Sequence, residues 1–242
     1  IEELYKGINM AAKKHEVNVV GGDISSSYSG LTISVSVIGF QSKDKIVYRE
    51  GAKDGDLIVV SGNIGAAYLG LRVLEREKQL LIEHKIPKLA LPEIEEKLSE
   101  YRYLVERQIK PEAQKKVIKL LHDNKIKPTA MIDVSDGLVP DLNHLAKQSN
   151  SGYNIYEKRL PIHKQTIETS HEFKISPMFA ALYGGEDYEL LFTVNKKEIK
   201  KIKETKGLTI IGEIIKRKKN NIFDINNTKI DLKEKGWGHF NI

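Results

Sequence analysis

The chain has 242 residues, of which 40% are hydrophobic, so it is long enough to form one large domain or two small ones around an ordinary core. It contains no cysteine, which excludes disulfide scaffolds, thiolate metal sites and cysteine nucleophiles and leaves oxygen and imidazole as metal ligands. The formal charge of +6 comes from lysines that mostly alternate with Glu and Asp, so a solvated surface is favoured over a nucleic-acid partner.

The first part of the chain is predicted to contain one helix and two strands. Residues 1–15 place their apolar side chains on one helical stripe. Residues 17–20, "VNVV", are predicted to be a short buried strand that runs into a glycine- and serine-rich loop. Residues 31–40, "LTISVSVIGF", alternate in polarity and are predicted to be a strand. The polar segment 41–56 is predicted to be a hinge between two domains.

The rest of the chain alternates predicted strands and helices, which indicates α/β or α+β layering. Residues 75–107 are charged and interrupted by prolines, and we expect them to form a helical insertion on the surface. Pro111 is expected at the start of the helix that follows. Strands are predicted at 57–60, up to Val134, and at 153–156, 188–194 and 209–214. Helices are predicted after 61–65, near 138–148 and within 195–205.

Several kinds of site and segment are not predicted. No run of eighteen apolar residues and no charged-then-apolar leader is found, so a membrane partner is not expected and a cytoplasmic location is. No stretch has the P-loop spacing G-x-x-x-x-G-K-[ST] or the dinucleotide spacing G-x-G-x-x-G. No two histidines have the H-x-x-x-H spacing of a zinc site.

The stretch "AMIDVSDGL" ends a predicted strand with two aspartates three positions apart. Asp133 and Asp136 can share a divalent cation, because Mg²⁺ prefers hard oxygen ligands and fills its other positions with water and phosphates. The helix that follows is expected to offer free N–H groups to an anion. Ser135 or Asp136 can equally be an ordinary helix N-cap. Spacing alone does not decide between a metal site and a cap.

Two glycine-rich stretches are weaker candidates. In "ALYGGEDYELLF" the glycines can let a ligand approach the backbone, and Glu186 and Asp187 can accept hydrogen bonds or bind a metal. Taken alone, this stretch is better explained as a tight turn with solvated acids. In "VVGGDISSS", Gly22 and Asp23 follow a predicted strand and can either hold a phosphate or only turn the chain.

Taken together and in this order, these stretches resemble the thiamine-monophosphate kinase family. The matching segments are "VVGGDISSS" with "LTISVSVIGF", "REGAKDGDLIVVSGNIGAAYLGL", "AMIDVSDGLVPDLNHLA", "ALYGGEDYELLF" and "GWGHF", and they span nearly the whole chain. The resemblance implies the two-domain layered α/β fold of enzymes similar to aminoimidazole ribonucleotide synthetase. It also implies ATP- and Mg²⁺-dependent phosphorylation of thiamine monophosphate to thiamine diphosphate, by direct transfer to the substrate's phosphate.

The resemblance also implies roles for individual residues in nucleotide and metal binding. Asp133 and Asp136 are expected to bind Mg²⁺ on the ATP phosphates, and Ser135 to contact the nucleotide. Gly22 and Asp23 are expected to add further nucleotide contacts. This set needs no general base, because joining two phosphates mainly requires charge neutralisation and alignment.

Three more residues complete the expected site. Arg49, in "REGA", is expected to contact ATP. Glu186 is expected to accept a hydrogen bond from the aminopyrimidine of the substrate, and Trp237 to pack against its rings. The family implies a homodimer, with residues 1–48 as the C-terminal part of an ATP-binding and dimerisation domain and 49–242 as an α/β domain carrying the insertion.

The possible absence of upstream residues and the similar metal chemistry of related enzymes leave other interpretations open. We expect the natural protein to carry about a hundred further residues before Ile1, the size of a small domain, and this chain alone to be incomplete and poorly active. Selenophosphate synthetase or aminoimidazole ribonucleotide synthetase uses similar metal chemistry and is the nearest alternative. A non-catalytic nucleotide-binding assembly protein that has lost part of its metal site is a second alternative of a different class.

Overall fold

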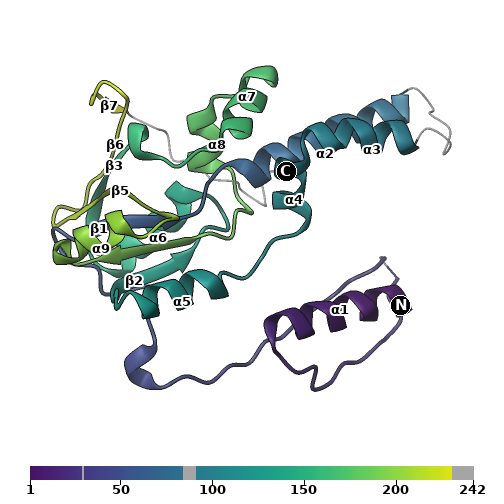
Figure 1. Ribbon diagram of the computed structural model, residues 1–242, viewed down its shortest axis with the longest axis horizontal. Helices are drawn as coiled ribbons and strands as arrows, with labels where there is room; N and C mark the ends of the chain where they lie inside the picture. Colours follow the sequence, from purple (N-terminus) through teal and green to yellow (C-terminus); the bar gives the residue numbers. More distant parts are fainter. Residues whose placement is uncertain (29, 84–90, 231–242) are drawn as a thin grey trace. The chain divides into compact units, whose positions relative to one another are not determined.

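The computed structural model describes residues 1–28, 30–83 and 91–230. The chain divides into two compact units, Ile1–Ile46 and Val47–Ile242, which we call the N-terminal and C-terminal units and describe separately (Figure 1). This division lies within the polar segment predicted to be a hinge. Among the described residues, none of the helices has the length and apolarity that crossing a membrane requires.

The N-terminal unit contains the predicted helix, α1, which runs over Glu2–His15. Acidic residues occupy its first turn and basic residues its last, so both ends complement the helix dipole. The helix ends at Glu16, whose left-handed conformation (φ 56°) lets its N–H reach the carbonyls of Ala12 and Lys13. A short 3₁₀ turn, η1, follows at Lys43–Lys45.

The two strands predicted in this unit are not formed. Residues 17–20 and 31–40 have no regular secondary structure. Their apolar side chains are exposed, for example Val35 at 75% and Phe40 at 96%. Alternating polarity indicates only that a segment suits an extended, half-buried surface, whereas a strand also needs a partner for its backbone hydrogen bonds. None of the described residues of this unit supplies that partner.

The C-terminal unit is built on a mixed sheet with the strand order β2-β4-β1-β5-β3-β6-β7. All neighbouring strands are antiparallel except β3 and β6. The strands predicted for this unit are present, and β6 and β7 were not predicted. The strands are β1 (Leu57–Ser61), β2 (Pro128–Asp133), β3 (Gly152–Tyr156), β4 (Leu190–Val194), β5 (Leu208–Ile215), β6 (Asn220–Phe223) and β7 (Lys229–Ile230).

The helices of this unit connect and cover the strands. The helix predicted near 138–148 is α6, whereas α7 and α8 were not predicted. The helix predicted to start at or just after Pro111 begins only at Lys115. Its apolar face on the sheet begins at Val117, so earlier residues gain little from helical burial. The helices are α2 (Ala66–Glu83), α3 (Leu91–Glu100), α4 (Arg102–Ile109), α5 (Lys115–Asp123), α6 (Leu138–Gln148), α7 (Lys164–Glu172), α8 (Pro177–Tyr183) and α9 (Ile199–Glu204), with short 3₁₀ turns η3 (Glu157–Arg159) and η4 (Lys196–Glu198).

Helices cover both faces of the sheet, which gives three layers. On one face, Ile58 and Val60 of β1 pack in a cluster with residues of α6 and α8. On the other face, Leu57 and Val59 pack with residues of α5 and α9. Successive side chains of a strand point to opposite faces of the sheet, and both faces are covered here, so every residue of β1 is buried. The central strand is therefore fixed on both sides.

The last helix of the predicted surface insertion is partly buried, which corrects that prediction. Leu104 of α4 is fully buried in a small cluster with Leu69 of α2 and Ala180 of α8, and Val105 is 8% exposed. A side chain at Gly70 of α2 would overlap the carbonyl oxygen of Leu104, so this glycine lets the two helix backbones approach closely. The helix α4 is therefore packed against the body of the unit.

The register of the sheet brings three strand ends together. Asp133, the last residue of β2, pairs with Leu190, the first residue of β4. Val60, near the end of β1, pairs with Leu191. The loops that follow β1 and β2 and the loop that precedes β4 therefore lie at the same end of the sheet, and these loops contain the acidic motifs found in the sequence.

Candidate functional site

The two acidic motifs of the C-terminal unit are joined by backbone hydrogen bonds. The N–H of Val134 donates to the carbonyl of Glu189, and the N–H of Tyr188 donates to the carbonyl of Val134, both at 2.8 Å. The N–H of Glu186 donates to the carbonyl of Ser135, also at 2.8 Å. The pairing of β2 with β4 thus continues into the loops, and it holds Ser135 beside Glu186.

Asp141 holds the turn that carries the two predicted metal ligands. Its Oδ2 accepts the N–H groups of Ser135 at 2.9 Å and Asp136 at 3.0 Å. The N-cap of α6 is Gly137, without a side-chain cap bond, so the interpretation of Ser135 or Asp136 as an N-cap is wrong. The two N–H groups are also not free for an anion. Burial raises the pKa of Asp141 to about 6, and the charges of Asp136 and Asp133 add to this rise.

Two glycines allow the loops to approach each other. Gly137 has a φ of 121°, and a Cβ there would lie 3.0 Å from the carbonyl carbon of Tyr183. A Cβ at Gly185 would overlap the carbonyl oxygen of Ser135. Glycine is therefore required at both positions by steric contact, and at Gly137 by the backbone angle as well.

Glu186 and Tyr188 face the same region as the two aspartates. Both have left-handed backbone angles, with φ values of 69° and 49°, which are uncommon for residues with a side chain. The Tyr188 hydroxyl donates to Glu186 Oε2 at 2.9 Å. The pKa of Tyr188 is raised to about 12, first by burial and then by the hydrogen bond to Glu186 and the charges of Glu186, Asp133 and Asp136. Three acids from two motifs therefore act on one phenol.

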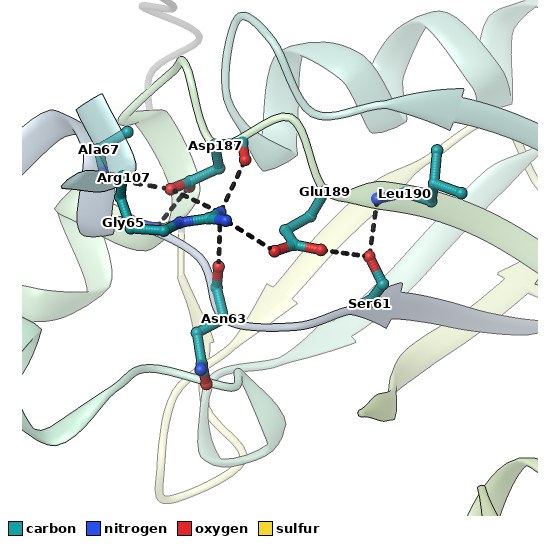
Figure 2. Close-up of polar contacts among 8 residues, drawn as sticks. All are labelled: Ser61, Asn63, Gly65, Ala67, Arg107, Asp187, Glu189 and Leu190. Carbon is teal, nitrogen blue, oxygen red and sulfur yellow. Dashed lines mark hydrogen bonds and ion pairs between the residues drawn. The ribbon is translucent and has the colours of Figure 1, made fainter. Parts of the chain in front are cut away.

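Asp187 is buried and does not face this region, although the sequence allowed a metal role for it. Its carboxylate accepts the N–H of Gly65 at 2.6 Å and of Ala67 at 3.2 Å, at the start of α2. Arg107 lies on its other side (Figure 2). Burial raises the pKa of Asp187 to about 6, against the lowering effect of the two N–H groups and Arg107. Asp187 is thus a structural acceptor at the start of a helix.

Asp133 and Asp136 suit a magnesium ion better than a metal held by protein alone. Within the described residues, no group of three or more His, Cys, Asp or Glu side chains is arranged to hold a metal. Both aspartates are exposed, and their charges act together on Asp141 and Tyr188. Mg²⁺ is usually held by one or two carboxylates plus substrate phosphates and waters. These two carboxylates therefore fit a metal that arrives with a nucleotide.

Arg49 belongs to the same unit but lies along β2, away from its end. It is exposed and follows Tyr48, whose carbonyl accepts the N–H of Met131 at 2.9 Å. Gly22 and Asp23 belong to the N-terminal unit, where Asp23 is exposed. Trp237 lies outside the described residues. The structure brings Asp133, Ser135, Asp136 and Glu186 together, and the roles of the other predicted residues stay predictions.

Comparison with known families defines the class of protein. The family described as "AIR synthase related protein, C-terminal domain" matches residues 53–225. The corresponding N-terminal domain matches residues 1–41. These two matches follow the division into units, and strands β1 to β6 of the sheet lie within the residues that match the C-terminal domain. The chain therefore belongs to the AIR synthase related proteins and matches both of their domains, which confirms the predicted fold class.

Individual relatives narrow the assignment. The chain is 33% identical to thiamine-monophosphate kinase of Aquifex aeolicus, over 99% of this chain and 69% of that protein. It is 32% identical to the enzyme of the same name from Bacillus subtilis, over 99% of this chain and 70% of that protein. A solved structure described as "AaThiL complexed with AMPPCP and TMP" matches with a TM-score of 0.72 and 28% identity, over 99% of this chain and 68% of that one. The chain belongs to the thiamine-monophosphate kinase family, and the predicted kinase class is confirmed.

Proposed function

We propose that this protein transfers the γ-phosphoryl group of ATP directly to the phosphate of thiamine monophosphate, in a reaction that requires Mg²⁺, to give thiamine diphosphate. The relatives named above and the AaThiL complex with AMPPCP and TMP support this reaction. The observation that carries the proposal is the backbone pairing of Ser135 with Glu186. It puts the predicted metal ligands and the predicted substrate acceptor next to each other.

The metal side of the proposed site consists of Asp133 and Asp136. These two carboxylates hold the Mg²⁺, which neutralises the repulsion between the phosphates when it is bound. The N–H of Ser135 already donates to Asp141 and its carbonyl already accepts from Glu186. Its hydroxyl is therefore the group that contacts the nucleotide, with Gly22, Asp23 and Arg49 as further nucleotide contacts.

The substrate side of the proposed site is Glu186, together with Trp237. Tyr188 binds Glu186 Oε2, which leaves Oε1 to accept from the amino group of the pyrimidine. Trp237 packs against the substrate rings. The substrate is thereby oriented by its aromatic rings, and its phosphate lies beside the ATP phosphates near Asp133 and Asp136. Orientation of this kind is a large part of what an enzyme can contribute to a phosphoryl transfer.

No residue of the site needs to act as a strong base. A phosphate acceptor is already largely ionised at neutral pH, so its oxygen attacks without losing a proton to the protein. The remaining task is to stabilise charge and align the attacking and leaving oxygens. This agrees with a site whose side chains are carboxylates that hold a metal and orient substrate.

The proposal is tested with the purified full-length natural protein, ATP, Mg²⁺ and thiamine monophosphate, with thiamine diphosphate measured by chromatography. Thiamine diphosphate is expected only when all three components are present, and a chelator such as EDTA is expected to abolish its formation. Circular dichroism confirms that the protein is folded under the same conditions. Folded protein that forms no thiamine diphosphate, or forms it equally well with the chelator, contradicts the proposal.

A further inference from the structure

The loop that carries Glu186 has two differently directed sets of side chains. Glu186 is exposed and Tyr188 half-buried, whereas Asp187 and Glu189 are 2% and 5% exposed. The outward pair faces the proposed substrate, and the inward pair enters the protein. Two neighbouring buried carboxylates repel each other and lose hydration, so their burial requires a cation and hydrogen-bond donors.

Arg107 of α4 supplies that cation. Its Nη1 lies 3.0 Å from Glu189 Oε1, and its Nη2 lies 3.8 Å from Asp187 Oδ1. Nη2 also donates to the carbonyl of Asp187 at 2.7 Å and to that of Asn63 at 3.4 Å. Figure 2 shows the guanidinium between the two carboxylates, above the Asn63 carbonyl. The side chain of Arg107 is only 20% exposed.

The same network extends to the end of β1. Glu189 Oε2 accepts the hydroxyl of Ser61 at 2.5 Å, and that hydroxyl accepts the N–H of Leu190 at 2.9 Å. The inward carboxylates are thus bonded on two sides, to Arg107 on one side and to Ser61, Gly65 and Ala67 on the other (Figure 2). The loop is held from the side opposite to the proposed substrate.

The planar guanidinium is suited to this task in a way that an ammonium is not. Its Nη1 forms an ion pair with Glu189, and its Nη2 binds the backbone carbonyl of Asp187 and lies near the carboxylate of Asp187. A lysine has a single charged nitrogen and cannot hold both partners in the same geometry. The packing of Leu104 in α4 fixes the helix from which Arg107 extends. Residues 75–107, to which the sequence assigned no role, thus contribute Arg107 to the support of the loop.

We propose that Arg107 is a positioning residue for substrate recognition, which holds residues 184–190 so that Glu186 is presented to the aminopyrimidine of thiamine monophosphate. This inference rests on the proposed function of Glu186. Arg107 touches neither substrate nor nucleotide in this arrangement and acts through the loop. A change at Arg107 therefore alters the use of thiamine monophosphate more than the use of ATP.

Arg107→Lys tests the proposal, because it keeps the positive charge but removes the planar guanidinium that binds both partners. The KM for thiamine monophosphate is expected to rise roughly tenfold, while the KM for ATP stays within a factor of about two. Arg102→Lys is the matched control, since Arg102 lies on the same helix, is 78% exposed and pairs only at the surface with Glu106. Equal rises in both KM values, or unchanged KM values in Arg107→Lys, contradict the proposal.

Hydrogen exchange provides a second measurement that does not depend on turnover. The N–H groups of Glu186, Tyr188 and Leu190 are hydrogen-bonded in this loop. Their exchange is expected to be faster in Arg107→Lys than in the wild type, and unchanged in Arg102→Lys. If Arg107→Lys does not fold, Glu189→Gln replaces it, because the amide keeps the shape and loses the charge.

The two measurements separate this inference from the proposed function. A wild type that makes no thiamine diphosphate while the exchange of the loop rises in Arg107→Lys contradicts the proposed function and supports the part of Arg107 in holding the loop. Unchanged exchange of the loop in both Arg107→Lys and Glu189→Gln overturns the inference, whatever the turnover of the wild type.

Discussion

At the scale of single residues, the site depends on acidic side chains that are close in sequence but differ in exposure. Asp136 is exposed and Asp141, five residues later, is buried and bonded to the turn before it. Glu186 is exposed, and Asp187 beside it is enclosed. Exposure therefore divides the acids into two that bind ligands in the proposed reaction and two that hold the backbone.

Asp133→Asn tests the metal side of the site. The amide keeps the size of the side chain and loses the charge that holds Mg²⁺, so turnover is expected to fall roughly a hundredfold, as when one electrostatic contact to the transition state is removed. Asp133 is exposed, so the melting temperature is expected to change little. Asp123→Asn, at an exposed aspartate ending α5, is the control. Turnover equal to the wild type at limiting Mg²⁺ removes Asp133 from the site.

Glu186→Gln tests the substrate side. Glutamine keeps one oxygen acceptor but has no charge, so the KM for thiamine monophosphate is expected to rise roughly tenfold, in the range of a lost charge-assisted hydrogen bond. The KM for ATP is expected to stay near that of the wild type. Glu168→Gln on α7, where the glutamate is 60% exposed, serves as the control. A parallel rise in both KM values means that Glu186 does not act on the thiamine end.

At the scale of secondary-structure elements, the site lies where three strand ends and the start of a helix converge. The β2–β4 pairing continues past Asp133 into the loops, so the two acidic motifs are connected by the ladder itself. Asp141 connects the first turn of α6 to the same loop. The elements thereby fix the backbone that presents the exposed acids.

Asp141→Ala tests this connection. The change removes the acceptor of two N–H groups, those of Ser135 and Asp136, in a buried position. Leaving such groups unpaired is expected to cost about 1–3 kcal/mol of the free energy of unfolding, measured by urea denaturation. The apparent affinity for Mg²⁺ is expected to fall as well, because the turn between Asp133 and Asp136 loosens. Unchanged stability and unchanged Mg²⁺ dependence contradict the assigned role of Asp141.

Much of the fold of the C-terminal unit could be predicted, because the periodicity of apolar residues and the positions of glycine and proline indicate local structure. The helix at 138–148 has a clear apolar stripe, and β1 is a continuous apolar run. Residues 31–40 have an equally clear alternation, yet they form no strand, because pairing depends on a second segment that the pattern does not specify. The local sequence indicates which segments can adopt an extended conformation. Whether such a segment becomes a strand depends on a second segment that pairs with its backbone.

The exposed acids of the site could be predicted, whereas the residues that hold them could not. Arg107 and Asp187 are 80 positions apart, and nothing in the spacing of either residue indicates the other. One signal was present in each helix: Asp141 and Arg107 are charged residues on otherwise apolar stripes, next to Leu142 and to Leu104. A charge on a buried stripe indicates a buried partner, but it does not identify which one.

At the scale of the whole molecule, the two units match the two domains of one family in chain order. The proposed metal and substrate residues Asp133, Asp136 and Glu186 belong to the C-terminal unit, and Gly22 and Asp23 are proposed nucleotide contacts from the N-terminal unit. The chain spans 69% of the length of its relative from Aquifex aeolicus.

The most direct test of the central proposal is to follow the label from [γ-³²P]ATP during turnover with Mg²⁺ and thiamine monophosphate. Direct phosphoryl transfer predicts that the label appears in thiamine diphosphate from the earliest times, and that Asp133→Asn slows its appearance while the protein stays folded. Label that appears only as inorganic phosphate, with none in thiamine diphosphate, would contradict the proposed function.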